Sequence, residues 1–223
     1  MDIELARFNM IEQQIRPWEV FDADVLSLLA AVRREDFVPP VYRAMAFVDT
    51  EIPLHTSQGP AQSMLAPKVE ARLLQELDVG KHERVLEVGA GSGFMAALLG
   101  HQAQQVLSLE IDAELAAFAT ANLRRAGASN VTVRHADGSR GCAAEGPFDV
   151  IVLSGSVPQV PPVFFEQLKP GGRLVAIVGQ LPIMRAVLYT RSTGDNGDTG
   201  SAELFDTVAP RLTGFDEPSR FHF

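Results

Sequence analysis

The segment that most constrains the fold is a glycine-rich turn near the middle of the chain. Residues 85–94 read VLEVGAGSGF, so a short apolar strand runs into three closely spaced glycines and then into a helix. Glycines in such a turn let the backbone bend tightly and approach a ligand closely. The segment therefore predicts the first strand-turn-helix unit of an α/β sheet, with a ligand at the carboxyl end of the strand.

The chain after residue 84 alternates between strand and helix patterns. We expect strands at 84–88, 106–110, 130–134, 148–153 and 173–178, and helices at 93–100, 112–125 and 161–168. This alternation predicts a mostly parallel, Rossmann-like sheet. Further strands are expected at 186–191 and 203–212, on either side of the turn-forming residues 194–198. They predict an antiparallel hairpin at the sheet edge, to which residues 221–223 could add a last strand.

The part of the chain before residue 80 has a different pattern. Apolar residues recur at helical spacing in 5–15, 24–32 and 67–77, whereas 52–67 is rich in Gly, Pro, Ser and Gln and is expected to be a long loop. We therefore divide the chain into an N-terminal helical segment with a substrate-side loop, 1–80, and a core, 81–223.

Composition excludes several classes of function. The net charge of −9 argues against nucleic acid and anionic membranes as partners, because both attract basic surfaces. The single cysteine, Cys142, can form neither an internal disulfide nor a cysteine-type zinc site, so we expect no metal. No apolar run is long enough to cross a membrane, and the first residues lack a signal-peptide pattern. These features predict a cytoplasmic protein and leave its oligomeric state open.

Acidic residues accompany the glycine turn and the end of the next strand. Glu87 precedes the spacing Gly89-x-Gly91-x-Gly93, where a carboxylate disfavours a pyrophosphate and suits an ammonium group. Glu110 follows about 20 residues later, where an acid can accept hydrogen bonds from both ribose hydroxyls. Each feature alone could be an ordinary turn or a solvated strand end. Together they favour a cofactor site and disfavour a nicotinamide dehydrogenase.

This combination resembles motif I of the class I methyltransferases, which implies S-adenosyl-L-methionine as cofactor and S-adenosyl-L-homocysteine as product. In the resembled class, the position of Asp137-Gly138 contacts the adenine. The cofactor residues implied are Glu87, Gly89, Ala90, Gly91, Ser92, Gly93, Glu110, Ile111, Asp137 and Gly138.

Stretches on either side of motif I, together with motif I itself, narrow the resemblance to the protein-L-isoaspartate O-methyltransferase family. Those outside motif I form two groups, one before it and one after it. They are residues 10–16, residues 34–39 with 42–43, and residues 158–161 continuing into 167–174. The resemblance implies methyl transfer to the carboxylate of isoaspartyl residues in damaged proteins or peptides. Such a carboxylate is already ionised at neutral pH, so the reaction requires no general base. Alignment of the two reactants can then supply most of the rate acceleration.

One position departs from the resembled family. The family's substrate loop carries a serine beside the transferred methyl group, and in this chain that position is Leu65, with Ser63 two residues earlier. Leucine offers no hydrogen bond to a carboxylate. Ser63 and Leu65 are therefore the expected acceptor-side residues. The alternatives are a methyltransferase of the same fold with another, small-molecule acceptor, or a weakly active cofactor-binding protein.

Overall fold

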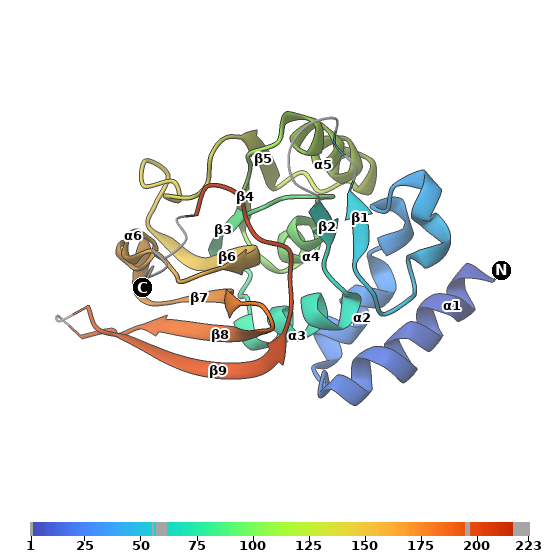
Figure 1. Cartoon of the computed structure of the whole chain (residues 1–223), viewed down its shortest axis with the longest axis horizontal. Helices are drawn as coiled ribbons and strands as arrows, with labels where there is room; N and C mark the ends of the chain where they lie inside the picture. Colours follow the sequence, from blue (N-terminus) through green and yellow to red (C-terminus); the bar gives the residue numbers. More distant parts are fainter. Residues whose placement is uncertain (1, 55, 57–61, 195–196, 216–223) are drawn as a thin grey trace, which may run out of the picture.

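The centre of the molecule is a seven-stranded sheet in the order β5-β4-β3-β6-β7-β8-β9 (Figure 1). The computed structural model describes residues 2–54, 56, 62–194 and 197–215. The strands are β3 (Arg84–Val88), β4 (Gln105–Glu110), β5 (Val131–His135), β6 (Phe148–Val157), β7 (Leu168–Gln180), β8 (Ile183–Arg191) and β9 (Thr199–Thr207). Strands β3 to β7 are parallel, while β8 is antiparallel to both β7 and β9. The predicted mostly parallel sheet with a C-terminal hairpin is thus confirmed.

Alternate side chains of the strands enter two separate hydrophobic cores. Val85, Val106 and Val150 belong to one core, and their neighbours Leu86 and Leu107 belong to the other. The first core is shared with the helices α1 (Ile3–Met10), α2 (Ala23–Ala31), α3 (Pro67–Leu77), α4 (Phe94–Gln102) and α5 (Ala113–Ala126). The second core is shared with α6 (Pro162–Glu166) and with residues near the described C-terminal end. Both faces of the sheet are therefore covered, as the apolar character of its strands requires.

The N-terminal helices follow their sequence signals closely. Asp2 and Asp22 each cap a helix by accepting a backbone N–H with the side chain, which satisfies a donor at the helix start. After α1 the chain continues through a π-helical turn, Ile11–Ile15, and a 3-10 turn, Arg16–Trp18. Two further 3-10 turns, η3 (Arg34–Asp36) and η4 (Pro40–Met45), lead to the substrate-side segment.

The segment expected to be one long loop contains two short strands. β1 (Ile52–Leu54) and β2 (Gln62–Met64) pair antiparallel, with Leu54 opposite Gln62. The expectation of a loop over 52–67 was therefore wrong for these residues. Strands of three residues are too short to show a periodic signal, and β1 also contains Pro53. Their buried side chains Ile52, Leu54 and Met64 face the protein interior.

The strand expected at residues 203–212 was also misplaced. β9 ends at Thr207, and residues 208–215 leave the sheet edge and pass the carboxyl end of β6 (Figure 1). There the Ser156 N–H donates to the Pro210 carbonyl at 2.7 Å, and the Leu212 N–H donates to the Ser156 carbonyl at 2.9 Å. Pro210 has no N–H for a continued β ladder, which explains why the strand could not extend to residue 212. Residues 195–196 of the predicted turn and residues 221–223 lie outside the described chain.

Candidate active site

The glycine turn lies between β3 and α4, at the carboxyl edge of the parallel strands. Gly89, Gly91 and Gly93 have φ angles of 93°, 52° and 84°, a region that residues with a side chain rarely adopt. The Gly89 N–H donates to the Leu109 carbonyl at 2.8 Å, which joins the turn to the end of β4. The turn is therefore a fixed element, in which Gly89 and Gly91 are only half-buried.

Glu110 ends β4 and is held against the same turn. One carboxylate oxygen accepts the Gly91 N–H at 2.8 Å, and the other accepts the Asp112 N–H at 3.0 Å. The residue is only 6% exposed. Each carboxylate oxygen has a second lone pair. Glu110 can therefore accept ligand hydroxyls while it fixes the glycine turn.

A cavity of about 350 Å³ opens at this edge of the sheet. This volume is in the range of pockets that bind small molecules. Six of the residues predicted from the sequence belong to its lining, namely Ser63, Gly89, Gly91, Glu110, Ile111 and Gly138. The structure thus brings together residues from four separate segments of the sequence.

Four other predicted residues lie next to this cavity rather than in its wall. Leu65, Glu87, Ala90 and Ser92 line a second cavity of about 30 Å³. Ser63, Gly89 and Gly91 line both cavities, so the two spaces are neighbours.

Two predicted cofactor residues have structural contacts elsewhere. Gly93 is the N-cap residue of α4, where a Cβ atom would lie 3.2 Å from the Ala119 carbonyl oxygen. The Asp137 carboxylate accepts the Ser139 N–H at 2.9 Å, and of the pair Asp137-Gly138 only Gly138 lines the larger cavity. At Gly138 a Cβ atom would lie 2.6 Å from the Val88 side chain, so glycine is needed for close packing.

Glu87 is a completely buried acid beneath the glycine turn. Its carboxylate accepts hydrogen bonds from the Ser108 hydroxyl at 2.5 Å and from the Ser154 hydroxyl at 2.8 Å. Burial raises the pKa of Glu87 from 4.5 to about 7, because removal from water disfavours the charged form. The two serine hydroxyls oppose this shift, while the charges of Glu110 and Glu70 add to it. Glu87 therefore titrates near neutral pH.

This raised pKa predicts a specific pH dependence of stability. Between pH 4.5 and about 7 the folded chain holds the Glu87 proton more tightly than the unfolded chain, so the free energy of unfolding falls as pH rises through this window. Glu87→Gln should remove this contribution, which is on the order of 3 kcal/mol for a shift of this size. Urea unfolding of both forms at about pH 5 and about pH 8 measures the difference. If the free energy of unfolding falls by the same amount between these two pH values in the wild type and in Glu87→Gln, then Glu87 is not the titrating group.

Several wall residues of the larger cavity were not found from the sequence. They are Leu54 and Gln62 from the β1–β2 hairpin, Ser154 from β6, and Leu212 and Thr213 from the C-terminal segment. The hairpin carried no periodic signal, and residues 208–212 were predicted to belong to a strand that ended before Thr213. A Cβ atom on Gly89 would lie 2.7 Å from the Leu212 side chain, so this segment packs directly on the glycine turn.

The β1–β2 hairpin places Ser63 and Leu65 differently. The Ser63 hydroxyl donates to the Glu51 carboxylate at 2.9 Å and borders both cavities. The Leu65 side chain is 5% exposed and borders only the smaller cavity, beside Glu87. Both side chains are thus next to the glycine turn, and Ser63 alone of the two borders the larger space.

The described part of the chain contains no group of three or more His, Cys, Asp or Glu side chains arranged to hold a metal ion. Within the same residues, no helix is both long and apolar enough to cross a membrane.

Comparison with known proteins identifies the family of this chain. The fold, the glycine turn and the acid at the end of β4 together define a Rossmann-like methyltransferase. The family model of protein-L-isoaspartate(D-aspartate) O-methyltransferase matches residues 6–202. The chain belongs to this family of transferases.

Curated relatives support the family over most of the chain. A protein-L-isoaspartate O-methyltransferase of Koribacter versatilis is 41% identical over 187 residues, which cover 84% of this chain and 82% of the relative. A second, from Rhodopseudomonas palustris, is 43% identical over 171 residues, which cover 76% of each chain.

Solved structures share the fold. A protein-L-isoaspartate O-methyltransferase superposes with a TM-score of 0.74 at 24% identity, covering 93% of this chain and 67% of the other. A putative enzyme of the same family from Plasmodium falciparum, in complex with S-adenosyl-L-homocysteine, gives a TM-score of 0.70 at 22% identity and covers 96% and 99% of the two chains.

Proposed function

We propose that this chain transfers the methyl group of S-adenosyl-L-methionine to the free carboxylate of L-isoaspartyl residues in damaged proteins and peptides. Family membership over residues 6–202 supports the activity, and the relatives give no support to another acceptor. The structural observation that carries the proposal is one cavity in which the glycine turn and Glu110 meet Ser63 of the β1–β2 hairpin.

The residues of the larger cavity fit this cofactor. Glu110 can accept both ribose hydroxyls, and Gly89 and Gly91 allow close approach of the amino-acid part. Ile111, 38% exposed, and Gly138 offer an apolar surface for the adenine. Glu87 is buried, and its carboxylate accepts a hydrogen bond from the hydroxyl of Ser154 in the cavity wall. Through this serine, Glu87 interacts with the ammonium group of the cofactor. We assign Ala90, Ser92, Gly93 and Asp137 to the support of this site rather than to its wall.

When bound, S-adenosyl-L-methionine supplies an electrophilic methyl group. The chain's task is to place an acceptor carboxylate in line with that group and to exclude water. The β1–β2 pair and the segment 208–215 both contribute residues to the cavity wall, which suits this task. Reactants held in alignment in this way can gain about 7–11 kcal/mol over free encounter.

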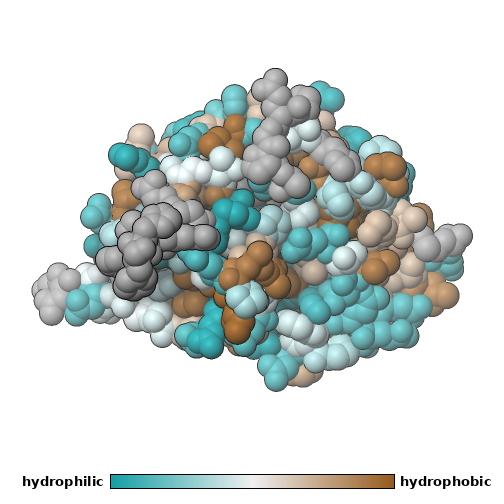
Figure 2. Space-filling model, viewed as in Figure 1, coloured by the Kyte–Doolittle hydropathy of each residue, from teal (hydrophilic) through white to brown (hydrophobic). Residues whose placement is uncertain are grey.

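The surroundings of the site suit a polypeptide acceptor. An apolar patch near the centre of Figure 2 lies over the turn between β7 and β8, at the carboxyl edge of the sheet. Leu181 and Ile183 of this turn are 72% and 61% exposed. We propose that the enzyme acts on soluble polypeptides in the cytoplasm.

The first experiment is titration calorimetry with S-adenosyl-L-homocysteine. The proposal expects saturable binding at one site per chain. A protein that is folded but does not bind this compound would contradict it.

A further inference from the structure

Arg34 is a buried cation that contacts three separate elements around the active site. It lies in η3 and is 1% exposed. One guanidinium nitrogen donates to the Leu65 carbonyl at 2.8 Å, and another donates to the Glu70 carboxylate in the first turn of α3. The guanidinium also lies over the Phe94 ring, 4.8 Å from its centre.

The three residues that Arg34 contacts all line the smaller cavity beside the proposed reaction site. Leu65 directly follows β2, the strand that carries Ser63 into the cavity wall. Phe94 is the first residue of α4 and directly follows the glycine turn. A single side chain therefore contacts both the residue after β2 and the first residue of α4.

A buried ion pair is a weak source of stability in general. Removing two charges from water costs several kcal/mol per ion, and apolar residues of similar size often stabilise a protein equally well. Glu70 is 4% exposed and offers Arg34 a charge partner at one fixed place. The contacts that Arg34 makes with Leu65 and Phe94 therefore explain the buried pair better than a contribution to stability does.

We propose that Arg34, fixed by Glu70, is a positioning residue that holds β2, and with it Ser63, at a set position over the glycine turn. The inference deepens the proposed function, because it concerns how the acceptor side of that site is held. Its specific consequence is that loss of the pair impairs acceptor binding more than cofactor binding.

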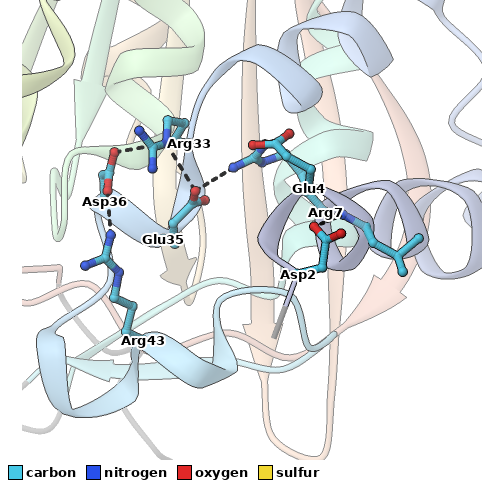
Figure 3. A network of polar contacts seen from close by, with 8 residues as sticks. Asp2, Glu4, Arg7, Arg33, Glu35, Asp36 and Arg43 are labelled. Atoms are coloured by element: carbon cyan, nitrogen blue, oxygen red, sulfur yellow. Dashed lines mark hydrogen bonds and ion pairs between the residues drawn. The ribbon is translucent and has the colours of Figure 1, made fainter.

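The neighbouring residue provides a matched control. Glu35 accepts a hydrogen bond from Arg7 of α1 at 2.5 Å, and the two side chains are 1% and 5% exposed (Figure 3). This pair is as buried as Arg34–Glu70, but it connects η3 to α1. Neither Arg7 nor Glu35 lines either of the two cavities at the glycine turn.

The test compares two double variants, Arg34→Met with Glu70→Leu, and Arg7→Met with Glu35→Leu. Each replaces a whole buried pair by apolar residues, so neither leaves a buried charge without its partner; Glu4 and Arg33, which also contact the control pair, are exposed. We expect the first variant to raise the KM for an isoaspartyl peptide at least tenfold, with the Kd for S-adenosyl-L-homocysteine changed less than threefold. We also expect amide hydrogen exchange in residues 62–66 to accelerate at least tenfold. The control variant should change neither quantity.

Arg34→Lys supplies a second, milder form of the test. Lysine can still form an ion pair with Glu70. It lacks the planar guanidinium, whose separate nitrogens donate to Glu70 and to the Leu65 carbonyl at the same time. This variant should fold, with faster exchange in 62–66 and a raised peptide KM. If the Arg34→Met, Glu70→Leu variant fails to fold, Arg34→Lys alone tests the inference.

Unchanged exchange and unchanged KM in a folded Arg34 variant would overturn the inference, and so would equal effects in the Arg7–Glu35 variant. A wild-type protein that binds S-adenosyl-L-homocysteine but methylates no isoaspartyl peptide would instead contradict the proposed function. In that case the hydrogen exchange result alone decides whether Arg34 positions the hairpin.

Discussion

Glu110→Ala should weaken the binding of S-adenosyl-L-homocysteine at least about tenfold, since hydrogen bonds to a charged acceptor contribute about 1.5–3 kcal/mol each. The variant loses the acceptor proposed for the ribose hydroxyls. It also loses the acceptor of the Gly91 and Asp112 N–H groups, so the glycine turn loses its anchor on β4. Titration calorimetry on the two proteins measures the change in Kd.

Two further variants separate these effects. Glu110→Gln keeps one oxygen for a backbone N–H and loses the charge, so its affinity should lie between those of the wild type and the alanine variant. Glu145→Ala removes an exposed acid that pairs with Arg134 and does not line the larger cavity, and it should leave the affinity unchanged. An unchanged Kd in Glu110→Ala would remove this residue from the proposed cofactor site.

Leu65→Ser should increase kcat/KM for isoaspartyl peptides about ten- to a hundredfold, if the added hydroxyl donates to the acceptor carboxylate in the transition state. The family resemblance places a serine at this position, and Leu65 is buried beside Glu87 and Ser63 in the smaller cavity. The wild type should accordingly be a weak enzyme on such peptides. Initial rates against peptide concentration, at saturating cofactor, measure the change.

Leu65→Ala and Ser63→Ala serve as the matched variants. Leu65→Ala opens the same space without a hydroxyl, so a gain shared by both Leu65 variants would point to size rather than to a hydrogen bond. Ser63→Ala removes the hydroxyl that borders both cavities and donates to Glu51. High wild-type activity that falls in Leu65→Ser and in Ser63→Ala would identify Ser63 as the acceptor contact instead.

The sequence predicted the sheet, and the meeting of the glycine turn with the end of β4, because both rest on local patterns. The glycines of residues 89–93 require a tight turn, and the apolar runs that precede Gly89 and end at Glu110 require buried strands. Parallel strands place their carboxyl ends at one edge, so the spatial meeting of Gly91, Glu110 and Gly138 follows from the order of elements alone.

The acceptor side could not be predicted in the same way. The β1–β2 hairpin has strands of three residues, and its position depends on long-range contacts such as that of Arg34 with the Leu65 carbonyl. Leu212 and Thr213 reach the cavity only because the chain turns back after β9 and pairs with Ser156. Such contacts leave no periodic signal in the sequence. The environment of Glu87 was also hidden, because its two serine partners come from β4 and β6.

Methyl transfer to matched isoaspartyl and aspartyl peptides of otherwise identical sequence tests the central claim most directly. The protein is incubated with S-adenosyl-L-methionine labelled in the methyl group, and base-labile label is counted on each peptide. We predict a base-labile methyl ester on the isoaspartyl peptide and none on the aspartyl peptide, at a rate that increases in Leu65→Ser. Equal labelling of both peptides, or no labelling of either by a protein that binds the cofactor, would contradict the proposed function.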